Sequence, residues 1–149
     1  MEMTKNQYKE YMKELAGRVW TDPGYSMEKY NADLDAVTIL PLDLSAYPQL
    51  SEEKQKWINI LFDEEDKDRN GNYMLRGFTR NEWQEMEKLG VSYGDYCRDG
   101  LSFWAYNNED RMIYTYCEGD TTLKVFADDE SYQKEYNETL NWYKEEYAS

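Results

Sequence analysis

Residues 101–127 contain three short runs rich in aromatic and β-branched residues, separated by two turn-forming segments. The runs are Leu101–Tyr106, Met112–Glu118 and Thr121–Ala127. Connections of two to a few residues, such as Gly119-Asp120, join neighbouring strands in antiparallel order. The sequence therefore predicts an antiparallel meander of three strands. In the third strand, alternation places Leu123 and Val125 on one face and Phe126 on the other.

Capping residues and helical periodicity predict helices on both sides of this meander. We expect the first helix to stop at Gly17, because glycine commonly follows a helix C-terminus. The third helix is the most apolar, and we expect it to end and fray in the acidic run of residues 63–66, because four acids at a helix C-terminus oppose the macrodipole. The predicted helices begin at or just after Thr4, Ser26, Ser51, Thr79 and Asp128.

The last predicted helix carries an apolar stripe of tyrosines and one leucine at spacings of three and four residues. This spacing indicates that Tyr132, Tyr136 and Tyr143 form the amphipathic edge of a core. Residues 37–42 are apolar and β-branched, but Pro41 cannot donate a ladder hydrogen bond and restricts them to an edge strand or an extended segment.

The chain has 149 residues and a mass of 17.9 kDa, which is the size of one domain. We expect a single acidic α+β domain over residues 1–149. Its small antiparallel sheet consists of the C-terminal three-stranded meander plus possible edge strands, packed with about four or five helices.

The formal net charge is −14, and half of this excess lies in residues 101–149. Direct binding of nucleic acid is disfavoured, because phosphate contacts require a basic face. The chain contains no histidine, which excludes histidine-dependent nucleophile activation and histidine metal ligation. The polar N-terminus and the lack of a long apolar stretch predict a cytoplasmic protein without a membrane span.

Residues 66–71, Asp-Lys-Asp-Arg-Asn-Gly, match the first half of a calcium loop. Asp66, Asp68 and Asn70 supply oxygens at positions 1, 3 and 5. Position 12, which holds a bidentate glutamate in such loops, is Gly77 here. Two interpretations stay open, a weak divalent-cation site and a solvated turn built on Asn70-Gly71.

Acidic residues gather at the start of the last predicted helix, at Asp128, Asp129, Glu130, Glu135 and Glu138. Carboxylates held on a folded surface can occupy a basic cleft that normally binds phosphates. We therefore predict that these five residues bind a basic nucleic-acid-binding protein. In size and charge the chain resembles the small acidic anti-restriction and anti-CRISPR proteins of phages and mobile elements, and this resemblance implies an inhibitor that acts by protein–protein interaction.

Two alternatives come from other classes, a divalent-cation-binding module and an enzyme that uses carboxylates. No phosphate-binding glycine motif is present, and Cys97 and Cys117 are not in a Cys-x-x-Cys motif. We therefore expect a protein without a cofactor and without enzymatic activity.

Overall fold

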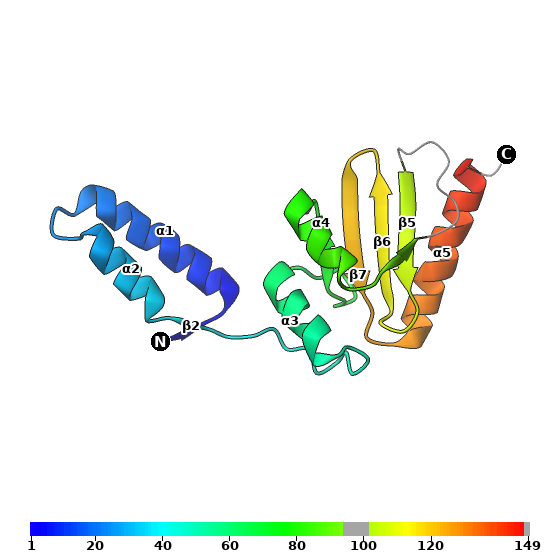
Figure 1. The fold of residues 1–149 in the computed structure, drawn as a ribbon, viewed down its shortest axis with the longest axis horizontal. Helices are drawn as coiled ribbons and strands as arrows, with labels where there is room; N and C mark the ends of the chain where they lie inside the picture. The colour runs from blue at the N-terminus through cyan, green and yellow to red at the C-terminus, as the bar shows by residue number, and fades with distance from the viewer. Residues whose placement is uncertain (94–101, 148–149) are drawn as a thin grey trace. The chain divides into compact units, whose positions relative to one another are not determined.

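A computed structural model describes residues 1–93 and 102–147 of the chain (Figure 1). Contacts divide the chain into two compact units, which are described separately below. Unit 1 comprises Met1–Leu42 and Asp63–Glu65, and unit 2 comprises Asp43–Phe62 and Asp66–Ser149. The single domain expected from chain length stays a prediction. Cys97 lies outside the described residues.

Unit 1 is a pair of helices joined to a two-stranded parallel ladder. The helices are α1 (Lys5–Thr21) and α2 (Met27–Asp35), and the strands are β1 (Glu2–Met3) and β2 (Thr38–Ile39). Thr4 caps α1 in a reciprocal capping box with Gln7, and Ser26 caps α2, as the sequence predicts. The extended segment predicted at residues 37–42 contains the short strand β2.

The predicted helix stop at Gly17 is wrong, because α1 runs through this glycine and ends four residues later. A glycine inside a helix costs only about 1 kcal/mol, which the hydrogen bonds of the continuing helix offset. The helix ends where Pro23 disfavours helical geometry at the preceding residue. Accordingly, Asp22 is extended, at φ −115° and ψ 106°, and its N–H still donates to the carbonyl of Arg18.

Unit 2 contains a five-stranded antiparallel sheet in the order β3-β7-β6-β5-β4. Strands β5, β6 and β7 form the predicted meander, and the α+β prediction is confirmed. Strands β3 and β4 extend the meander and form the two edges of the sheet. The bounds are β3 (Met74–Arg76), β4 (Ser92–Tyr93), β5 (Ser102–Asn107), β6 (Met112–Cys117) and β7 (Asp120–Val125).

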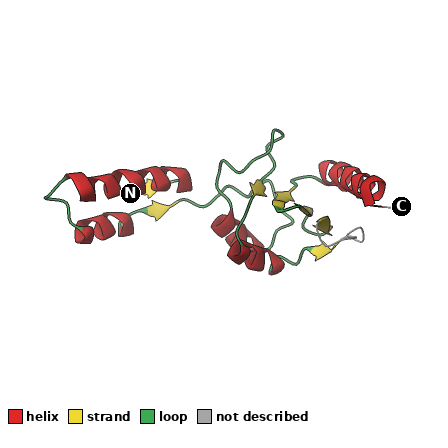
Figure 2. Cartoon of the chain, turned by 90° about the horizontal axis from the view of Figure 1, so that it is seen from above, coloured by secondary structure: helices red, strands yellow, loops and turns green. Residues whose placement is uncertain are grey.

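Helices cover both faces of this sheet, as Figure 2 shows from above. Helix α5 (Asp129–Tyr147) packs Tyr132 and Tyr143 against Trp104 in a buried cluster. The predicted core position of these tyrosines is thus confirmed. On the opposite face, α4 (Arg80–Glu87) places Trp83 4.6 Å from the ring of Tyr114.

Helix α3 (Glu52–Leu61) ends before the acidic run that the sequence assigns to its last turn. Phe62 is extended, at φ −106° and ψ 151°, and is fully buried, with its ring edge-on to Tyr73 at 6.2 Å. Carboxylates at a helix C-terminus oppose the macrodipole, and burial of Phe62 requires the chain to leave the helix. The predicted end within residues 63–66 is therefore wrong, because the helix ends at Leu61, before the acids.

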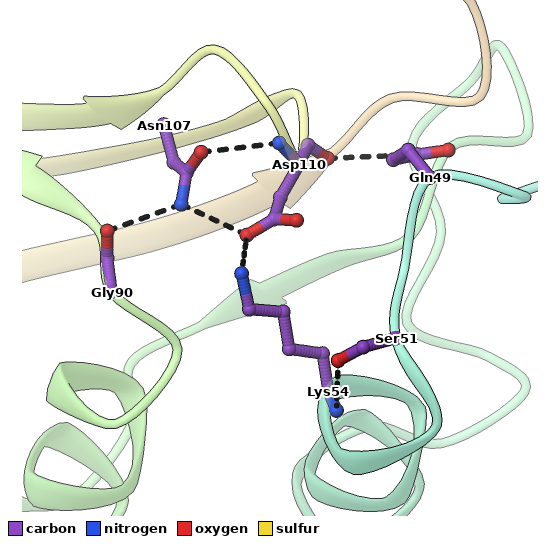
Figure 3. A network of polar contacts seen from close by, with 6 residues as sticks. All are labelled: Gln49, Ser51, Lys54, Gly90, Asn107 and Asp110. Carbon is purple, nitrogen blue, oxygen red and sulfur yellow. Dashed lines mark hydrogen bonds and ion pairs between the residues drawn. The ribbon is translucent and has the colours of Figure 1, made fainter.

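A buried carboxylate connects α3 to the turn between β5 and β6 (Figure 3). Asp110 is only 3% exposed, and it pairs with the ammonium of Lys54 and accepts a 2.8 Å hydrogen bond from Asn107 Nδ2. Gln49 Nε2 donates to the carbonyls of Asp110 and Phe126, at 3.0 and 2.9 Å. These contacts join three segments of unit 2 that are distant in sequence.

We predict that Lys54→Met lowers the free energy of unfolding by about 3 kcal/mol, because it leaves the buried Asp110 carboxylate without its cation. Urea denaturation at pH 7 measures this change. The control is Lys56→Met, an exposed lysine of the same helix, which we expect to change stability by less than about 0.5 kcal/mol. Equal losses in the two variants would contradict the prediction.

Candidate functional site

The acidic residues singled out from the sequence lie on the first three turns of α5 or immediately before it. Asp128 caps the helix, because its carboxylate accepts hydrogen bonds from Ser131 N at 2.7 Å and Ser131 Oγ at 2.9 Å. The backbone and side-chain hydrogen bonds from Ser131 hold the pKa of Asp128 below its ordinary value. This aspartate therefore has a structural role in addition to its charge.

The other four acids differ in their surroundings. Asp129, Glu130 and Glu138 are exposed and make no ion pair with any residue in the described part of the chain. Glu135 is half-buried, and its carboxylate lies 3.7 Å from Lys124 Nζ. The sequence-predicted set thus consists of three unpaired carboxylates and one ion-pair partner on α5, and one capping carboxylate immediately before it.

Two hollows border the side of α5 that carries Glu135 and Glu138. The first, of about 350 Å³, lies between α5 and β6 and includes Cys117, Thr139 and Trp142. Trp142 is 44% exposed, and its ring packs edge-on against Tyr143 at 4.8 Å. A large, partly exposed aromatic side chain next to carboxylates is typical of protein–protein interfaces.

The second hollow, of about 870 Å³, contains the loop that resembles a calcium site. Asp68 Oδ1 accepts from the N–H groups of Asn70 and Asn72, both at 2.9 Å, and Asp68 Oδ2 lies 3.2 Å from Lys124 Nζ. Gly71 adopts φ +83°, which closes a turn that β-carbon-bearing residues rarely form. The Asp68 carboxylate is thus engaged by its own loop and by a lysine.

The remaining calcium-loop positions do not complete a ligand set. Gly77 directly follows β3, and its N–H donates to the carbonyl of Thr121 at 3.0 Å. Among the described residues, no group of three or more histidine, cysteine, aspartate or glutamate side chains is placed to hold a metal ion. Cation binding by Asp66, Asp68 and Asn70 stays a prediction, with no contact in the structure that favours it.

Two features of this region could not be found from the sequence. Lys124 bridges Asp68 and Glu135, which are 67 residues apart in numbering, and it also lies 5.5 Å above the ring of Phe126. The hollow itself forms only because β3 pairs with β7 and brings Met74 opposite Lys124. One local feature of the sequence could have indicated a basic surface here. Lys67 and Arg69 alternate with the acids of the calcium-like run.

Comparisons with protein-family models, with curated proteins and with solved structures gave no match to this chain. In the described part of the chain, no helix combines the length and the apolar character needed to cross a membrane. The functional assignment therefore depends on the geometry of unit 2 and on its charge.

We predict that Asp68→Asn lowers the free energy of unfolding by about 1–2 kcal/mol at pH 7, because hydrogen bonds to a charged group are lost. Burial by itself raises the pKa of Asp68, but hydrogen bonds from Asn72, Lys124 and Asn70 lower it below the ordinary 3.8. Because the pKa of Asp68 is lower in the folded state, its ionised carboxylate stabilises the folded protein at pH values above 3.8. This contribution disappears as the pH falls through the folded-state pKa.

Urea midpoints measured between pH 7 and pH 2 test this dependence. The difference between the wild type and Asp68→Asn should shrink once the pH is below 3.8. The exposed Asp35→Asn variant, at the end of α2, is the control and should stay within about 0.5 kcal/mol of the wild type at pH 7. A difference that grows on acidification would contradict the assignment.

Proposed function

We propose that the protein binds a basic nucleic-acid-handling protein and blocks it by presenting carboxylates in place of phosphates. It would act in the cytoplasm as an inhibitor of the anti-restriction or anti-CRISPR kind, without catalysis and without contacting nucleic acid itself. The observation that carries this proposal is the set of exposed, unpaired carboxylates on α5, Asp129, Glu130 and Glu138.

The charge density of α5 supports this proposal. Residues 128–138 span about 15 Å at 1.5 Å per residue and contain five carboxylates, or about one per 3–4 Å of axis. A single strand of DNA carries about one phosphate per 3.4 Å. Lys134 offsets one of these charges and Lys124 contacts Glu135, which leaves about one net charge per 5 Å, or roughly two-thirds of the charge density of one strand.

The rigidity of α5 supports it as well. Tyr132 and Tyr143 are buried against the sheet, and Tyr143 Oη donates to the carbonyl of Phe103 at 3.0 Å. A helix anchored in this way holds its outward carboxylates in place before any partner arrives. Pre-organised charges lose less side-chain and backbone entropy on binding than charges on a disordered tail.

The first test is inhibition of DNA cleavage by a restriction endonuclease and by an RNA-guided nuclease. We expect inhibition that duplex DNA competes away and that weakens as the salt concentration rises. The triple variant Asp129→Asn/Glu130→Gln/Glu138→Gln should weaken inhibition by about tenfold or more, because it removes three unpaired interface charges. These substitutions leave the Asp128 cap and the Lys124 ion pair intact.

The matched control removes three exposed carboxylates from unit 1, as Glu2→Gln/Glu10→Gln/Glu14→Gln. Its change in net charge is the same, so a general effect of charge would weaken inhibition equally in both variants. Equal losses would contradict a localised mimic surface on α5. Protection of unmodified phage in cells with a restriction system provides the corresponding assay in vivo.

A second prediction concerns Trp142, which lies on the same helix as these carboxylates. Partly exposed tryptophans often anchor interfaces, and their removal mainly speeds dissociation. We expect Trp142→Ala to raise the dissociation rate from the inhibited nuclease about tenfold with little change in salt dependence, as surface plasmon resonance would measure. A change confined to the association rate would contradict an anchoring role.

A further inference from the structure

The 870 Å³ groove of unit 2 lies on the face of the sheet that α5 covers. Register places Met74 opposite Lys124 and Arg76 opposite Thr122, so these β3 and β7 residues share one face. The loop of residues 67–72 and the early turns of α5 form the other walls. The lining side chains are Lys67, Asp68, Arg69, Asn70, Asn72, Met74, Arg76, Lys124, Phe126, Ser131, Lys134, Glu135 and Glu138.

This groove is rich in cations, although the chain as a whole has a net charge of −14. Five of the lining side chains are basic and three are acidic, which leaves a local excess of two positive charges. Lys124 accounts for two of the acids through its contacts with Asp68 and Glu135. Glu138 is the remaining acid.

Of the other four cations, Lys67 interacts electrostatically with Asp43, and Arg69, Arg76 and Lys134 have no carboxylate partner within residues 1–93 and 102–147. Lys67 Nζ lies 4.9 Å from the centre of the Tyr73 ring, and Arg76 Nη2 lies 3.9 Å from the sulfur of Met74. Arg69 and Lys134 make no hydrogen bond or ion pair with any described residue. The positive charge in the groove is therefore available to a ligand.

A mostly buried amide in the same groove offers a further hydrogen-bond donor. Asn72 is only 7% exposed, and its Oδ1 accepts a long hydrogen bond of 3.5 Å from Ala127 N. This contact assigns Oδ1 to the protein side, and Nδ2 donates to no residue in the described part of the chain. Asn72 lines the groove, so its Nδ2 is a donor that an oxygen of an anionic ligand can accept.

The calcium-like run therefore has a different role from the one its composition indicates. Asp68 is used within the loop, where it accepts from two backbone N–H groups and contacts Lys124. The alternate residues Lys67 and Arg69 line the groove, and Arg69 does so without a carboxylate partner in the described part of the chain.

We propose that this groove binds a small polyanion with more than one phosphate group, such as inorganic polyphosphate or the phosphate chain of a nucleotide. Cations on three elements fit a ligand with several charges, and the fork of Arg69 matches phosphate oxygens. Phe126 is buried and lies under Lys124, so it offers no ring face to a nucleobase. The strong negative charge of the whole chain repels long polyanions such as DNA, which favours a small ligand. This site does not depend on the proposed inhibitor function.

The test is calorimetric titration of the full chain with inorganic tripolyphosphate, at low salt and without divalent cations. Amide NMR shifts of residues 66–72 serve as a second readout. We expect one site, with inorganic phosphate binding at least about tenfold more weakly because it contacts fewer cations. Equal affinity for tripolyphosphate and ATP would assign recognition to the phosphate chain, whereas tighter ATP binding would assign the ligand to the nucleotides.

The variant Arg69→Gln/Lys134→Gln should weaken tripolyphosphate binding at least about tenfold. The control Lys56→Gln/Arg80→Gln removes two exposed cations outside the groove, and its affinity should stay within about twofold of the wild type. Glu138→Gln should strengthen binding, because it removes a repelling carboxylate from the groove. A gain in affinity cannot result from misfolding.

The proposal is overturned if tripolyphosphate gives neither heat nor NMR shifts, or if the two double variants lose affinity equally. It is also overturned if Ca²⁺ binds at micromolar concentration and Asp68→Asn abolishes that binding, since the groove would then be a cation site. Tighter binding of a glutamate-rich peptide than of tripolyphosphate would reject the phosphate class.

Discussion

The buried carboxylate of Asp110 is the interaction on which the arrangement of unit 2 most depends. It lies in the turn between β5 and β6, and its contacts with Lys54 and Asn107 attach α3 to that turn. Next to it, Arg111 adopts φ +54° and donates to Gln49 Oε1 at 2.7 Å and to the carbonyl of Ala127 at 2.7 Å. The carbonyl of Ala127 lies just before α5, so the same network positions the start of the acidic helix.

A single helix combines a structural face and a charged face. The tyrosine face of α5 is buried against Trp104 and Phe126, where aromatic contacts supply most of the packing. Because this face is held by the sheet, the outward carboxylates are fixed relative to β6 and β7. The proposed inhibitor function needs this rigidity, since a flexible acidic segment would lose its ordering entropy at the moment of binding.

Glu135 and Glu138 separate two hollows of different chemistry. One contains a partly exposed indole, and the other is lined by basic side chains although the protein is acidic. The two proposals share Glu138 but involve different ligands, a basic protein and a small polyanion. Glu138 is expected to favour the first ligand and to oppose the second, so one residue distinguishes them.

Local patterns in the sequence determined most of the secondary structure. The capping residues Thr4, Ser26, Ser51 and Thr79 begin helices as predicted, because a side-chain oxygen satisfies a backbone N–H within the same few residues. The meander and the buried tyrosine stripe were also predictable, because short turns and helical spacing act over short stretches of chain. The C-terminal ends of the helices were less predictable from local patterns. Gly17 is tolerated inside α1, and burial of Phe62 ends α3 before the acids.

The tertiary structure alone decided which charges are paired. Asp68 was correctly placed in a loop, but its partner Lys124 belongs to a strand that reaches it only through the pairing of β3 with β7. In the same way, no local pattern pairs Lys54 with Asp110 or brings Lys134 to the groove that contains Arg69. Composition determined that the protein is acidic. Contacts between distant segments determined where carboxylates stay unpaired on α5 and where cations gather, because the energy of a charge depends on neighbours that only the folded chain supplies.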